Sequence, residues 1–130
     1  MSVAYFDTSA LVKLVRHEPG TDALRHWLAT RSGTIATSVV ADVELRRAVR
    51  RVGDSVADPE HVLSGVAQIS LTRPIIERAG LLAQVTLRSL DAIHLATALE
   101  IGDDLSELVA YDVRLLEAAA LAGIRVHTPV

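Results

Sequence analysis

The chain has 130 residues, half of them hydrophobic and only 3% aromatic, and a net charge of −3. It has no cysteine, which excludes disulfides, thiolate nucleophiles and cysteine-ligated zinc. The few aromatic residues argue against an aromatic platform for single-stranded nucleic acid. The N-terminus lacks a basic signal region, and no apolar stretch reaches the ~20 residues that cross a bilayer. We therefore expect a cytoplasmic protein of one domain, residues 1–130.

The first third of the chain alternates strand and helix patterns. Residues 3–6 form an apolar run typical of a buried strand, and the capping types that follow from Asp7 predict a helix over 10–16. After a Pro-Gly pair, an apolar face predicts a second helix over 22–29. A strand is then expected over 34–37.

The middle of the chain is mainly helical in pattern. Ser38 is expected to cap a long helix that ends near residue 52, and a polar turn is expected over 53–58. The cap-then-proline pair Asp58-Pro59 begins another helix. A short strand is predicted over 69–71, followed by a helix over 74–85 that begins at a proline.

The last third repeats the alternation. Ser89 is expected to cap a strongly apolar helix over 90–101. A strand over 108–111, a helix over 113–121 and a final strand over 124–127 complete the chain. Short strands alternating with longer helices predict an α/β fold with a mostly parallel sheet.

Two aspartates occupy equivalent positions in this pattern. Asp7 and Asp112 each follow a predicted strand and precede a predicted helix. In a parallel sheet such junctions lie at the carboxyl ends of the strands, where ligands bind. Taken one at a time, each is better read as an ordinary helix cap.

Two further carboxylates lie on helix faces that are otherwise apolar. Glu44 shares a four-residue spacing with Val40 and Ala48, which places its carboxylate on the apolar stripe of the helix. An equally good interpretation is that Glu44 lies at the edge of the core, with its aliphatic stem packed and its carboxylate in water. Asp91 lies in the first turn of the most apolar helix, where the helix dipole would stabilise it. His94, one turn later, is favoured as a buried core residue, although contact with the site or with Asp91 stays open.

If these four acids converge, their mutual repulsion requires a cation. Two carboxylates ~5 Å apart at an effective dielectric of ~20 repel by about 3 kcal/mol. A set of hard oxygen ligands favours Mg²⁺ or Mn²⁺ over Zn²⁺. The candidate catalytic and metal-binding residues are Asp7, Glu44, Asp91 and Asp112.

The surroundings of these acids match a known family pattern. The segments that carry the match are residues 6–13, 41–45, 89–98 and 110–115. They resemble, in order, the four motifs of PIN-domain proteins, especially the VapC-type toxins of type II toxin–antitoxin systems. The motif acids map onto Asp7, Glu44, Asp91 and Asp112, so no acidic position is missing.

The resemblance implies a three-layer α/β/α domain and a metal-dependent endoribonuclease. It also implies a homodimer and a co-encoded antitoxin whose tail would occupy the acidic groove. Small polar residues at Thr8 or Ser9 would add a hydroxyl to the site. Cleavage would leave a 5′-phosphate and a 3′-hydroxyl.

The helix that carries Glu44 also carries four arginines, Arg46, Arg47, Arg50 and Arg51. Guanidinium groups suit phosphate, so this face could hold RNA, meet an acidic antitoxin segment or simply be solvated. The net charge taken alone argues against RNA. Once the four candidate acids are set aside, however, the remaining charges nearly balance.

Two other classes of function remain open. A receiver-like phospho-acceptor could use Asp7, but it would normally need a lysine at a later strand end, and the only lysine is Lys13. A non-catalytic interaction module would use its carboxylates as caps and in salt bridges.

Overall fold

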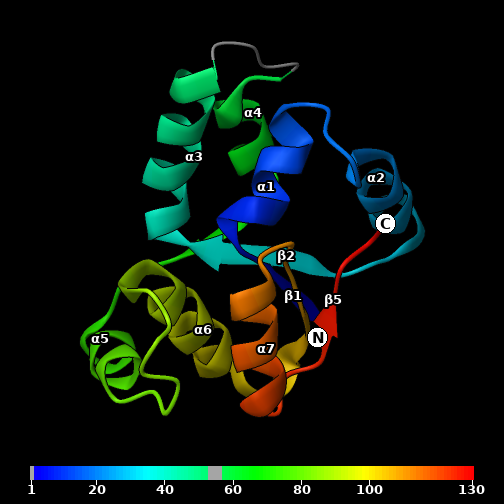
Figure 1. Cartoon of the computed structure of the whole chain (residues 1–130). Helices are drawn as coiled ribbons and strands as arrows, with labels where there is room; N and C mark the ends of the chain where they lie inside the picture. The colour runs from blue at the N-terminus through cyan, green and yellow to red at the C-terminus, as the bar shows by residue number, and fades with distance from the viewer. Residues whose placement is uncertain (1, 53–56) are drawn as a thin grey trace.

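The computed structural model describes residues 2–52 and 57–130, and its centre is a five-stranded, wholly parallel sheet. The strands lie in the order β3-β2-β1-β4-β5 (Figure 1). Their bounds are β1 Val3–Phe6, β2 Thr34–Ser38, β3 Ala67–Ile69, β4 Leu105–Val109 and β5 Val126–His127. The chain runs outward from β1 to β3 and then returns to the other side of β1 to form β4 and β5. The point of reversal, between β1 and β4, is where ligands bind in sheets of this kind.

Helices cover both faces of the sheet. Their bounds are α1 Thr8–Val15, α2 Thr21–Thr30, α3 Val39–Val52, α4 Pro59–Ser64, α5 Arg73–Gly80, α6 Ser89–Ile101 and α7 Val113–Leu121, with a 3₁₀ turn at Gly102–Asp104. Figure 1 shows α1, α3 and α4 on one side of the sheet and α5, α6 and α7 on the other. Because parallel crossovers are right-handed, reversing the direction of strand addition moves the helices to the opposite face.

The pleat of β1 divides the core between these two faces. Ala4 and Phe6 pack in one apolar cluster with α1, α2, α3 and α4. Tyr5 points the other way, into a second cluster with α6 and α7. Successive strand residues face opposite sides, so a fully buried β1 supplies both cores. The expected three-layer α/β/α architecture is confirmed.

Four predicted helix caps are confirmed, and one is wrong. The side chains of Asp7, Ser38, Asp58 and Asp112 each accept a hydrogen bond from a backbone N–H in the first turn of the following helix. Ser89, however, lies inside α6, and the N-cap position belongs to Arg88, whose side chain makes no capping bond. The helix starts one residue early because Ala92 N–H already donates to Arg88 O, at 2.8 Å.

Several predicted boundaries also shift. The helix expected over 74–85 ends at Gly80, since glycine disfavours helix continuation and Leu81 closes the last turn onto Arg78 O. The strand expected over 69–71 is β3, two residues earlier, where it pairs with β2. β4 begins three residues before the predicted 108–111. β5 has only two residues. In the turn expected over 53–58, residues 53–56 lie outside the described part of the chain.

Among the described residues, the helices are too short or too polar for any of them to cross a lipid bilayer.

Candidate active site

The four candidate acids meet at one pocket at the carboxyl ends of β1 and β4. The pocket has a volume of about 380 Å³. It is lined by Asp7, Thr8, Ser9, Glu44, Arg88, Ser89, Leu90, Asp91, His94 and Asp112. The acids come from the end of β1, from α3, from α6 and from the end of β4. The four acids therefore converge on one pocket, as the sequence led us to expect.

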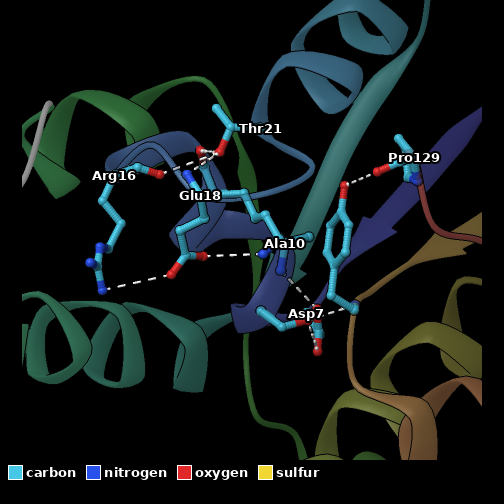
Figure 2. Close-up of polar contacts among 9 residues, drawn as sticks. Asp7, Ala10, Arg16, Glu18, Thr21 and Pro129 are labelled. Carbon is cyan, nitrogen blue, oxygen red and sulfur yellow. Dashed lines mark hydrogen bonds and ion pairs between the residues drawn. The ribbon is translucent and has the colours of Figure 1, made fainter.

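Asp7 is the most buried of the acids, with 3% of its surface exposed. Its carboxylate accepts from Ala10 N–H at 3.1 Å, and the Ser9 hydroxyl lies 2.7 and 2.9 Å from its two oxygens. Figure 2 shows Asp7 and Ala10 at the start of α1. Burial raises the pKa of Asp7 to about 6, although His94, Ser9 and Ala10 oppose the rise. A buried carboxylate with so few donors gains from a nearby cation.

Ser9 links the two central strand ends. Its oxygen accepts from Tyr111 N–H at 2.9 Å while its hydroxyl faces Asp7. Tyr111 follows β4, so this contact fixes Asp7 relative to the segment that leads to Asp112. The hydroxyl that the resemblance places near the site is thus in direct contact with a candidate acid.

Glu44 is held by hydrogen bonds from two other elements. Its Oε1 accepts from the Thr8 hydroxyl at 2.8 Å and lies 2.7 Å from His94 Nε2. Burial raises the pKa of Glu44, but the hydrogen bonds and charge of His94, together with Thr8, outweigh it and leave the pKa below its ordinary value. The carboxylate within hydrogen-bond distance of His94 is thus Glu44, whereas the sequence had left contact with the site or with Asp91 open.

Asp91 and Asp112 form the other half of the pocket. Burial and the charge of Asp112 raise the pKa of Asp91 above its ordinary value, with Glu44 adding to the rise and His94 opposing it. Asp112 Oδ1 accepts from the N–H groups of Arg114 and Leu115, at 2.9 and 3.2 Å. The cap uses only one oxygen of Asp112, so capping and ligand binding are compatible roles for this residue.

The donor set fits a hard divalent cation, although it is not a closed cage. Within residues 2–52 and 57–130, no three His, Asp or Glu side chains are arranged to hold a metal ion as they stand. Mg²⁺ keeps several waters and is usually bound by one or two carboxylates together with substrate phosphates. Four carboxylates around one pocket, two of them with raised pKa, meet that requirement.

The arginines of α3 have different surroundings. Arg46 pairs with Asp42 and, at 2.7 Å, with Glu60, so its guanidinium is already engaged by protein. Arg47 and Arg51 line an adjoining pocket of about 550 Å³, whereas Arg50 lines neither pocket.

Arg88 was missed by the sequence reasoning, and it lines the acidic pocket itself. Its position immediately before the third motif was the available signal.

The PIN domain family matches residues 4–121. The chain belongs to the PIN-domain family. Among its PIN-domain relatives, ribonuclease VapC47 of Mycobacterium tuberculosis (strain CDC 1551 / Oshkosh) is 43% identical, over 96% of each chain. Ribonuclease VapC46 of Mycobacterium tuberculosis (strain ATCC 25618 / H37Rv) is 39% identical over 99% of each chain.

Solved structures share the PIN-domain architecture. A toxin–antitoxin complex from Klebsiella pneumoniae contains a chain with a TM-score of 0.71 and 27% identity, covering 98% of both chains. The Mycobacterium tuberculosis toxin VapC20, described as cleaving the sarcin–ricin loop, has a TM-score of 0.72 at 16% identity. Coverage is 93% of this chain and 95% of VapC20. The second similarity supports the fold alone.

Proposed function

We propose that this PIN-domain protein is a metal-dependent endoribonuclease and the toxin of a type II toxin–antitoxin pair. The observation that carries the proposal is the convergence of Asp7, Glu44, Asp91 and Asp112 on one pocket. Relatives named as ribonucleases, identical at up to 43% of positions over nearly the whole chain, support it. The toxin–antitoxin complex from Klebsiella pneumoniae contains a chain of the same fold, and this similarity supports an antitoxin as the partner.

The reaction is hydrolysis of an RNA phosphodiester bond. Asp7, Glu44 and Asp91 would hold Mg²⁺ or Mn²⁺, and Asp112 would hold a second ion or position the water. When bound, such an ion supplies Lewis acidity toward the phosphate and activation of water. The chain's own contribution is orientation: Ser9 and the first turn of α1 fix Asp7, and Thr8 fixes Glu44. The products would carry a 5′-phosphate and a 3′-hydroxyl.

Arginines around the site would hold the substrate. Arg88 borders the acidic pocket, and Arg47 and Arg51 border the adjoining one, which shares Thr8 and Glu44 with it. Guanidinium groups recognise phosphate by bidentate geometry. The same adjoining pocket would suit an acidic antitoxin segment. The homodimer remains a prediction from the family resemblance, and the cytoplasmic location remains a prediction from the sequence.

The receiver-like alternative would need a lysine at a later strand end, and Lys13, the only lysine of the chain, does not lie there. Lys13 lies in α1, where it pairs with Glu18 at 3.2 Å and stands over the Tyr111 ring. A lysine engaged there does not serve a phospho-acceptor at Asp7.

Cleavage of a labelled unstructured RNA by the purified protein tests the proposal. We expect cleavage with Mn²⁺, none with a chelator, and a loss of at least about 100-fold in Asp7→Asn, because a direct ligand should matter no less than its outer-shell partners. Asp22→Asn is the matched control, since Asp22 lies on α2 with its side chain 86% exposed. Parent-level cleavage by Asp7→Asn would refute the proposal and leave the non-catalytic interaction module.

A further inference from the structure

His94 is a buried histidine whose two ring nitrogens are both engaged. It lies in the apolar helix α6 and is 1% exposed. Its Nδ1 lies 2.6 Å from the Tyr5 hydroxyl, and its Nε2 lies 2.7 Å from Glu44 Oε1. The three residues come from β1, α6 and α3, so the contacts join the centre of the sheet to a helix on each of its faces.

The chemistry of the partners determines where the hydrogens lie. The carboxylate of Glu44 can only accept, so Nε2 carries the hydrogen and donates it. The hydroxyl of Tyr5 can then donate to Nδ1. A tyrosine hydroxyl can act as a hydrogen-bond donor, and the 2.6 Å separation places it within hydrogen-bond distance of Nδ1. The two hydrogen bonds therefore run in one direction, from Tyr5 through His94 to Glu44.

Both hydrogen bonds to Glu44 fall on the same one of its two carboxylate oxygens. Oε1 receives both the Thr8 hydroxyl, at 2.8 Å, and His94 Nε2. In the described part of the chain, no hydrogen bond to protein falls on Oε2. A glutamate has three side-chain torsions, and two donors on one oxygen remove much of that freedom before any ligand arrives.

We propose that Tyr5 and His94 are positioning residues that anchor Glu44 through Oε1 and leave Oε2 as its single metal-binding oxygen. The inference rests on the proposed function, because it assumes that Glu44 binds the metal. Outer-shell hydrogen bonds of this kind orient a ligand and tune its affinity. His94 itself is neither a ligand nor a proton carrier for substrate, since neither ring nitrogen is free.

The tautomer can be tested on the metal-free protein. In ¹⁵N-histidine spectra at about pH 8, His94 should carry its hydrogen on Nε2 and none on Nδ1. A hydrogen on Nδ1 would overturn the inference, because Tyr5 would then not be the donor. This measurement needs no substitution and no activity.

Metal affinity tests the consequence. The double variant Tyr5→Phe/His94→Leu replaces both partners of the Tyr5–His94 hydrogen bond by apolar groups, a change that can be nearly neutral for stability. Glu44 loses its His94 donor but keeps Thr8, and its side chain is 24% exposed and so accessible to water. We expect Mn²⁺ to bind at least about 10-fold more weakly, with a melting temperature close to the parent's. Tyr111→Phe is the matched control, because the Tyr111 hydroxyl donates to Pro129 O at 2.7 Å and Tyr111 does not line the pocket.

Dependence on Glu44 separates positioning from a general structural role. Added to Glu44→Gln, the Tyr5→Phe/His94→Leu pair should change Mn²⁺ affinity less than about 2-fold, because the ligand it positions is already lost. An undiminished loss in that background would overturn the inference. If Glu44→Gln weakens Mn²⁺ binding but the pair alone does not, the positioning role fails and the proposed function stands. If Glu44→Gln itself leaves Mn²⁺ binding intact, the assignment of Glu44 as a ligand fails.

Discussion

Asp7→Asn is expected to change how the stability of the metal-free protein depends on pH. Asp7 is 3% exposed, and burial raises its pKa from 3.8 to about 6. A raised pKa means that the folded state disfavours the charged form. The penalty is absent below about pH 4, grows as pH rises through the folded pKa, and is complete above it. At 1.36 kcal/mol per pKa unit, the full penalty is about 3 kcal/mol.

Asparagine keeps the helix cap but carries no charge, so it removes this penalty. We expect the free energy of unfolding of Asp7→Asn, relative to the parent, to rise by about 2–3 kcal/mol between about pH 4 and pH 8. Denaturant unfolding with a chelator present measures the difference at each pH. The variant would thus be stabilised at neutral pH in a form that we expect not to cleave RNA, a trade-off common at active sites.

The matched control is again Asp22→Asn, which makes the same change at a side chain that is 86% exposed and so removes no buried carboxylate. A difference between Asp7→Asn and the parent that stays flat with pH would refute the reasoning. It would mean that Asp7 is not held as a desolvated carboxylate in the folded protein.

Two further predictions concern the rest of the site. Asp112→Ala should lose about 1 kcal/mol of stability because it removes the cap of α7, whereas Asp112→Asn should retain that stability. Both variants should lose cleavage activity. An equal loss of stability in the two variants would contradict the capping geometry. Arg88→Ala should raise the KM for RNA several-fold with little change in structure by circular dichroism, because Arg88 borders the acidic pocket. Arg46→Ala should leave KM near the parent value, because Asp42 and Glu60 already bind that guanidinium.

The positions of the strand-end acids were predictable because they follow from a general rule. Asp7 and Asp112 each follow an apolar run and precede a helix, and parallel strands bring their carboxyl ends to one edge. Glu44 was visible as a charge on an apolar stripe of its helix. These features are local in the sequence, so periodicity and capping chemistry were enough to find them.

The partners of long side chains were not predictable in the same way. His94 contacts Glu44 across 50 positions of sequence, and that contact depends on how α3 and α6 pack around the sheet. Arg46 pairs with Asp42 one helical turn away, a contact that the four-residue spacing on a helix favours. Its second partner, Glu60, lies on α4 and removes Arg46 from the residues free to hold a phosphate. Helix periodicity contains no information about such contacts between elements.

Anomalous diffraction from crystals soaked in Mn²⁺ tests most directly whether the acids share an ion. We predict a manganese peak in the pocket, coordinated by oxygens from at least two of Asp7, Glu44 and Asp91, with Glu44 contributing Oε2. Manganese bound only elsewhere on the molecule, with these carboxylates left uncoordinated, would contradict the account.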